Sequence, residues 1–284
     1  MELYKGEYSN RVNLINKFLL NCENPYERNK FYKLINLFYK SNNKQIKILN
    51  ELYDNYKDIV LKISFIDSIK KEYNFAFQLT ELPNFIKYHY IFESNNTEEN
   101  ILCFNDIKNI INNNFIRLDY KEEPIGLLIM NYYKLGSIGK YEWNEYNFNI
   151  LKNVLTQVAF AILYAYEKTK FIHNDLHIDN IVLKPKSVNN INYGDCDLPI
   201  DVYEVIIMDF EKSTINNKEN KLMYIISDLR KLLNNVLYMS KSNITIVYNE
   251  LKLTTLIKGV FNKKYYNIIK DIIDTMEIEY INEI

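Results

Sequence analysis

The sequence predicts an α+β fold in which short apolar strands alternate with longer helices. Two observations predict it. Strand-like apolar runs occur at 58–63, 125–130 and 205–208. A longer helical pattern covers Phe148–Tyr166, with its apolar residues gathered on one side of the helix. At 284 residues the chain is long enough for one large domain or for two lobes with their own cores.

The first 44 residues are predicted to form an N-terminal helical extension. Apolar residues recur there at helical spacing, first at Leu14, Ile15, Phe18 and Leu19 and then over 34–38. Further along, residues 94–120 are polar and rich in asparagine, so we expect an insertion there. The stretch 184–204 is expected to be an inserted loop between two short strands, and the remainder of the chain is helical in pattern.

Lys62 stands among apolar neighbours in the strand 58–63. Burying an ammonium group is costly, so a lysine at such a position needs a partner. Glu72, on the helix that follows, is the predicted partner, and Glu81, where that helix should already be ending, is the competing candidate. The alternative is an edge strand on which Lys62 turns to water.

The stretch Phe171–Lys184 reads FIHNDLHIDNIVLK, and it is the part of the chain with the most chemistry. His173, Asp175 and Asn180 stand in a fixed order ahead of a short apolar strand. Downstream, the apolar run 205–208 ends in Asp209-Phe210-Glu211. A purely structural alternative is a helix-to-strand turn in which His173 and Asp175 cap local backbone groups.

This order of residues resembles the protein-kinase superfamily, whose catalytic loop has the pattern H-R-D-L-x-x-x-N and whose metal-binding turn is D-F-G. The form with His177 is similar to haspin-like kinases and to divergent viral or bacterial-effector kinases. The resemblance implies a two-lobed fold: a small antiparallel-sheet lobe over 45–132 with its insertion near 94–120, and a mainly helical lobe over 133–284.

The resemblance also implies roles for single residues and two cofactors, ATP and Mg²⁺. Asp175 would be the catalytic base, with His177 reaching the transferred phosphate or the substrate. Asn180 and Asp209 would bind Mg²⁺. Lys62, oriented by Glu72, would hold the nucleotide phosphates. The adenine pocket would be lined by the hinge residues Met130, Asn131 and Tyr132.

Several departures from the family pattern affect nucleotide binding and regulation. Residues 44–55, ahead of Lys62, contain no glycine, so the backbone cannot approach phosphates as a glycine-rich loop does. Asn174 replaces the arginine that reads activation-loop phosphorylation. No A-P-E motif follows Asp209, and Glu211 replaces the glycine of D-F-G.

Three functions remain open. The first is an atypical Ser/Thr protein kinase acting on a protein substrate. The second is a small-molecule kinase of the aminoglycoside or choline kinase type, in which H-N-D and D-F-E spellings are familiar. The third is a pseudokinase, a binding module without catalysis, which the missing glycine loop favours.

The amino-acid composition limits which binding partners and which cellular compartment we expect for this protein. A net charge of −1 and a pI near 6.4 give no electrostatic signature of nucleic-acid binding. No apolar run reaches the ~18 residues that span a bilayer. The three cysteines lack metal-ligand spacing, and the N-terminus lacks a signal-peptide pattern. We therefore expect a soluble, intracellular protein that is cytoplasmic or nuclear. If the source is a virus or the protein is a bacterial effector, the compartment would be that of a host cell.

Overall fold

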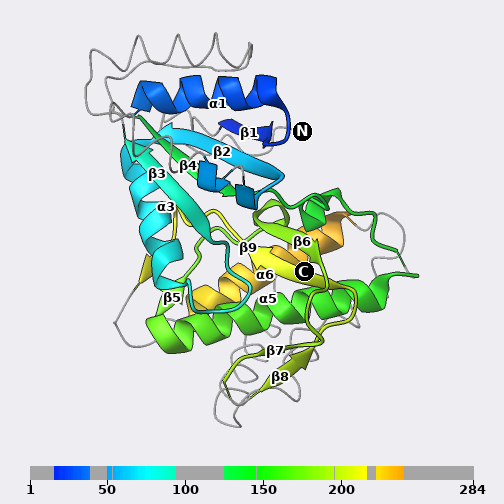
Figure 1. Ribbon diagram of the computed structural model, residues 1–284. Helices are drawn as coiled ribbons and strands as arrows, with labels where there is room; N and C mark the ends of the chain where they lie inside the picture. Colours follow the sequence, from blue (N-terminus) through cyan, green and yellow to red (C-terminus); the bar gives the residue numbers. More distant parts are fainter. Residues whose placement is uncertain are drawn as a thin grey trace, which may run out of the picture. The chain divides into compact units, whose positions relative to one another are not determined.

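The computed structural model describes residues 16–38, 50–52, 54–93, 125–144, 146–194, 196–215 and 222–239. Its architecture is mixed α+β with small antiparallel sheets (Figure 1). The chain divides into two compact units, residues 1–74 with 87–132 and residues 75–86 with 133–284. The division after Tyr132 is where the sequence placed the boundary, whereas the assignment of 75–86 to the second unit was not foreseen. The expected insertion near 94–120 lies outside the described residues.

The first unit is built on a four-stranded antiparallel sheet in the order β1-β2-β4-β3. Its strands are β1 (Asn16–Asn21), β2 (Asp58–Phe65), β3 (Tyr88–Glu93) and β4 (Ile125–Asn131). The strands expected over 58–63 and 125–130 are therefore confirmed as β2 and β4. They pair with each other, with Lys62 opposite Leu128.

Two helices accompany this sheet, α1 (Pro25–Phe38) and α3 (Ile66–Gln78). The approach of α3 to β4 depends on Gly126, because a Cβ there would lie 2.7 Å from Ile66 Cδ1 and 3.3 Å from Ile69 Cβ. A side chain at this position would require the side chains of Ile66 and Ile69 on the helix to move. Gly126 thus sets how closely the helix that bears Glu72 packs on the sheet.

The prediction of an entirely helical N-terminal extension is wrong for residues 16–21. They form β1, which pairs along the whole of β2 from Asn16 opposite Ile63 to Asn21 opposite Asp58. Four apolar residues in a short run fit a strand as well as a helical turn, and the free edge of β2 decides between the two. The second apolar set is helical as expected and lies in α1.

The second unit is centred on the long helix α5 (Phe148–Thr169). It is followed by β5 (Phe171–Ile172) and ends at Lys170, whose left-handed backbone donates its N–H to the Tyr166 carbonyl. Helix α5 packs against β5, against β9 (Tyr203–Ile207) and against α6 (Leu222–Met239). It is the one helix in the described ranges long and apolar enough to cross a membrane, but 61% of its apolar window is buried within the protein, as in an ordinary core helix.

The remaining strands of this unit form two-stranded antiparallel pairs. They are β6 (Ile181–Pro185) with β9, β7 (Asn190–Asn192) with β8 (Asp197–Pro199), and β10 (Thr214–Ile215) with β5. The short turns η1 (Ile138–Lys140) and η2 (Ile178–Asn180) lie next to each other. The segment leading out of α3 also joins this unit, because Ile86 N–H and Asn84 C=O bond to the backbone of Ile207 on β9.

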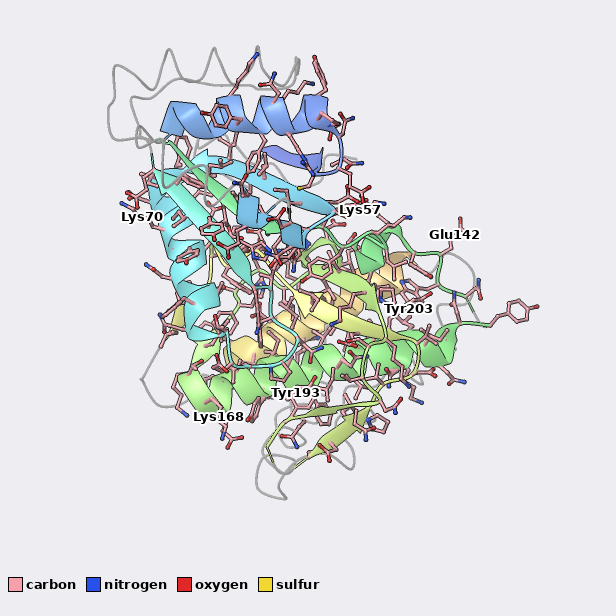
Figure 2. All side chains as sticks on the ribbon, viewed as in Figure 1. Lys57, Lys70, Glu142, Lys168, Tyr193 and Tyr203 are labelled. Carbon is pink, nitrogen blue, oxygen red and sulfur yellow. The ribbon has the colours of Figure 1, made fainter. Side chains whose placement is uncertain are left out.

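The inserted loop expected over 184–204 lies between β6 and β9, and it contains the β7–β8 hairpin, which was not predicted. Its apolar side chains turn inward, and Tyr193 (Figure 2) is buried and donates its hydroxyl to Asn84 Oδ1. The Asn84 amide in turn donates to the Val205 carbonyl at 2.8 Å. A buried polar network of this kind is stable only when its members are bonded, so the hairpin is a fixed part of the unit.

Gln157 connects α5 to β9 within this network. Its side chain is fully buried, its Nε2 donates to the Tyr203 carbonyl at 2.7 Å, and its Oε1 accepts from the Val205 N–H at 3.0 Å. The two bonds satisfy backbone groups of β9 that face the helix and have no strand partner there.

We predict that Gln157→Leu lowers the free energy of unfolding by about 3 kcal/mol, because two buried backbone groups lose their partners at roughly 1–3 kcal/mol each. Chemical denaturation followed by circular dichroism measures the change. Asn149→Ala, at an exposed position of the same helix, is the control and should stay within about 0.5 kcal/mol of the unsubstituted protein. Equal stabilities of the two variants would contradict the role of Gln157.

Candidate active site

In the first unit, Lys62 and Glu72 form a buried ion pair. Lys62 Nζ lies 2.5 Å from Glu72 Oε2, and each side chain is 1% exposed. Strand β2 supplies the lysine and α3 supplies the carboxylate, as the sequence predicted. Tyr88 on β3, which the sequence reading missed, donates its hydroxyl to Glu72 Oε1. Both carboxylate oxygens are therefore bonded, which a buried charge requires.

The three residues expected to line an adenine pocket stand at the end of β4. Met130 is buried and is paired with Val60 of β2, whereas Tyr132 is partly exposed. Asn131 closes the strand, and its Oδ1 lies 2.8 Å from Nε2 of His89. Their contact with a nucleotide base remains a prediction.

In the second unit, the loop after β5 is shaped by hydrogen bonds to its backbone. Asn174 takes a left-handed conformation with φ 63°, which asparagine adopts more readily than most residues. Its N–H donates to Asp228 Oδ2 at 2.8 Å, from helix α6. Burial raises the pKa of Asp228, although the N–H groups of Asn174 and Leu176 favour its charged form. Asp228 thus holds the backbone of this loop from helix α6.

The side chain of Asn174 bonds to the segment that follows Asp209. Its Nδ2 donates to the Lys212 carbonyl at 3.1 Å and to Thr214 Oγ1 at 3.0 Å. In the same region Ser213 Oγ donates to the His173 carbonyl at 3.1 Å. An uncharged amide thus ties the loop to this segment.

His173 is the buried centre of this loop. Its Nε2 lies 3.1 Å from the Met208 carbonyl, and its Nδ1 is 3.3 Å from the Asp175 N–H. A carbonyl only accepts and an N–H only donates, so these partners fit the neutral ring with its proton on Nε2. Burial lowers the pKa of His173 to about 4. The Met208 carbonyl and the charges of Asp209 and Asp175 act to raise this pKa, but burial outweighs them. The ring packs edge-on against Phe210, with centroids 5.8 Å apart.

The β6–β9 pair brings the expected metal ligands to the same end of two strands. Asn180 immediately precedes β6, and Asp209 follows β9 by two positions. The Met208 N–H donates to the Asn180 carbonyl at 3.0 Å, which extends the pairing of Ile181 with Ile207. Asp209 has a left-handed backbone with φ 70°, a conformation that is uncommon outside glycine and frequent at functional sites.

Asn180 is oriented by the loop that carries Asp175. Its Nδ2 donates to the Asp175 carbonyl at 3.1 Å, and among the described residues no donor bonds to its Oδ1. Together with the Asp209 carboxylate, this amide oxygen offers the hard oxygen ligands that Mg²⁺ prefers when nucleotide phosphates complete its coordination. In the described ranges no group of three or more His, Cys, Asp or Glu side chains gathers as a metal cluster. The donor set fits Mg²⁺ shared with a phosphate ligand.

The Asp175 carboxylate is held by two lysines that sequence reasoning did not single out. Lys231 Nζ on α6 lies 2.8 Å from Oδ1, and Lys212 Nζ lies 2.9 Å from Oδ2. Partial burial acts to raise the pKa of Asp175, but the two lysines outweigh it and lower the pKa to about 2. The side chain is therefore ionised at neutral pH. A signal for Lys231 existed, because it follows Asp228 by three residues and so shares its helix face.

His177 lies close to Asp175 but is oriented by a local cap. Its Nδ1 accepts the Asp179 N–H at 3.3 Å at the start of η2, and its Nε2 is 3.9 Å from Asp175 Oδ2. The ring thus presents Nε2 to the Asp175 carboxylate. Its contact with a phosphate or substrate remains a prediction.

Comparison with known proteins identifies no function for the chain. No family model matches it. A stretch of 37 residues, 13% of the chain, is 49% identical to "Uncharacterized protein 098R" of Invertebrate iridescent virus 6. The match therefore spans only a small part, 6%, of the length of that viral protein.

We predict that Glu72→Leu and Lys62→Met each lower the free energy of unfolding by about 3–5 kcal/mol, because each leaves a buried group without its charge partner. The double variant Lys62→Met/Glu72→Leu should recover most of that loss, since an apolar pair needs no counter-charge. Chemical denaturation of the four proteins gives the coupling energy. Additive losses would contradict a direct buried pair.

We predict an acid-sensitive contribution to stability from His173. The unfolded chain binds a proton near pH 6.5, whereas the folded ring does so near 4. Stability from the neutral ring is therefore complete above 6.5 and falls as pH drops toward 4, by about 3 kcal/mol at ~1.4 kcal/mol per pH unit. Denaturation at a series of pH values measures the slope. His173→Gln should remove it, and an unchanged slope in that variant would contradict the assignment.

Proposed function

We propose that the chain is an atypical Ser/Thr protein kinase with a two-lobed kinase-like fold, transferring a phosphoryl group from Mg-ATP to a protein hydroxyl. The observation that carries the proposal is the grouping of Asp175, Asn180 and Asp209 at the end of the β6–β9 pair. Phosphoryl transfer needs one carboxylate to orient the attacking hydroxyl and oxygen ligands for the metal on the phosphates.

Each side chain has a separate task in this proposal. Asp175, ionised and held by two lysines, accepts a hydrogen bond from the attacking hydroxyl and directs it toward the phosphoryl group. Asn180 and Asp209 hold Mg²⁺, which neutralises developing charge on the phosphates when bound. His173 stays neutral and keeps the loop backbone in place through the Met208 carbonyl and the Asp175 N–H.

The buried pair in the first unit supports the same function independently. An ion pair in an apolar interior is no more stabilising than a hydrophobic pair of similar volume, so its presence calls for a functional reason. A lysine held in one orientation by Glu72 and Tyr88 is suited to binding nucleotide phosphates. The similarity to a short stretch of an iridescent-virus protein is in keeping with a viral origin of the chain.

A small-molecule kinase is the second candidate. It is favoured by the short distance along the chain between Asp209 and α6, which begins at Leu222, because little chain is left for a peptide-docking platform. A pseudokinase is the third, favoured by the absence of glycine from 44–55. Incubation with radiolabelled ATP and either generic proteins or aminoglycosides and amino-alcohols separates the first two.

We predict that Asp175→Asn lowers phosphorylation by roughly 100-fold to 10,000-fold, the usual loss when a positioned acid–base group is removed. Nucleotide binding should persist, because Asp175 orients the acceptor and not the phosphates. Asp209→Asn should instead weaken both activity and the stabilisation by Mg-ATP. Phosphate incorporation and thermal shift with Mg-ATP measure the two properties.

Asp201→Asn is the matched control, since it removes an exposed carboxylate of the same unit. It should leave activity and the thermal shift unchanged. Phosphorylation that survives Asp175→Asn would refute the role of Asp175. No stabilisation of the unsubstituted protein by Mg-ATP would favour the pseudokinase.

A further inference from the structure

Two lysines from separate elements converge on Asp175. Lys231 on α6 bonds to Oδ1, and Lys212 in the turn after Phe210 bonds to Oδ2, at 2.8 and 2.9 Å. Each oxygen of the carboxylate is thus held from outside the loop that carries it. Any hydroxyl that bonds to Asp175 arrives within a few ångströms of two ammonium groups, since hydrogen bonds to a carboxylate are about 2.7 Å long.

These ammonium groups are accessible. The side chains of Lys212 and Lys231 are 52% and 48% exposed, whereas that of Asp175 is 21% exposed. An ammonium carries three N–H donors, and a bond to one carboxylate oxygen uses one of them. In the described part of the chain Lys231 makes no other hydrogen bond, so it has donors left for an incoming acceptor group.

Two described carboxylates near Lys231 are bonded to other groups. Asp228 is buried and accepts the loop N–H groups, and Asp179 accepts a hydrogen bond from Ser137 Oγ. The exposed positions of α6 recur at helical spacing and include no carboxylate: Tyr224, Ser227, Lys231 and Asn234. This exposed face of α6 is therefore neutral to cationic.

We propose that Lys212 and Lys231 determine acceptor specificity by binding an anionic group, a carboxylate or a phosphate, next to the hydroxyl that Asp175 orients. The substrate is then an acidic peptide segment. This inference rests on the proposed kinase function and adds its substrate class. Charges at the rim of an interface act mainly by excluding wrong partners. A basic peptide segment would be repelled by the positive charges of Lys212 and Lys231.

The test measures phosphorylation of short serine peptides that differ only in their flanking residues, acidic, neutral or basic. The unsubstituted protein should prefer the acidic peptide through a lower KM. Lys231→Met and Lys212→Met should each raise that KM by roughly fivefold, the upper value for an exposed ion pair. Lys231→Glu should shift the preference toward the basic peptide.

Lys168→Met is the matched control, because Lys168 is an exposed lysine in the last turn of α5 (Figure 2). It removes the same charge and should leave the ranking of the peptides unchanged. The KM for ATP should also stay unchanged in all variants. An equal loss of kcat for every peptide would overturn the inference, because it would mean that the lysines contact the transferred phosphoryl group instead.

A binding measurement without nucleotide separates this inference from the proposed function. Fluorescent peptides with alanine in place of serine should bind more tightly when flanked by glutamates, and Lys231→Glu should abolish that difference in anisotropy titrations. Such binding in a protein that fails to phosphorylate anything would uphold the anion site and refute the kinase. Equal binding of acidic and basic peptides would overturn the anion site, whatever the activity.

Discussion

The antiparallel pairing of β6 with β9 is the constraint on which the second unit depends. It joins Ile181 to Ile207 and continues through the bond from the Met208 N–H to the Asn180 carbonyl. Buried apolar side chains on both strands set the pairing register. A register shift of one residue would move these side chains to the opposite face of the sheet. The same register determines that Asn180 and Asp209, which are far apart in the sequence, leave their strands side by side.

Buried polar groups hold the loops around this pair. His173 links the loop to the end of β9, Asp228 links it to α6, and Gln157 links β9 to α5. Each of these groups has its partners, so the cost of taking it out of water is offset. Unlike apolar contacts, such bonds hold only one relative position, and they therefore determine where the carboxylates stand. The edge-to-face rings of Phe171, His173 and Phe210 fill the space beneath them.

Much of the local structure was predictable from patterns within short windows. Strands β2, β4 and β9, helix α5 and the partnership of Lys62 with Glu72 follow from apolar runs, helical spacing and the cost of a buried ammonium. Residues 16–21 were misassigned because a short apolar run does not distinguish a strand from a helix until an edge is available to pair with it. The β7–β8 hairpin was missed because its strands are three residues each and its burial depends on Asn84.

The sequence by itself determined which chemical groups are present and in what order: a lysine within an apolar strand, a histidine and two carboxylates around short strands, and an amide between them. Only the tertiary structure decided the partners of those groups. Asp175 is 37 residues from Lys212 and 56 from Lys231, and no periodicity extends over such separations. Ion pairs and buried hydrogen bonds act over a few ångströms, so they depend on how distant elements pack, which a linear pattern does not record.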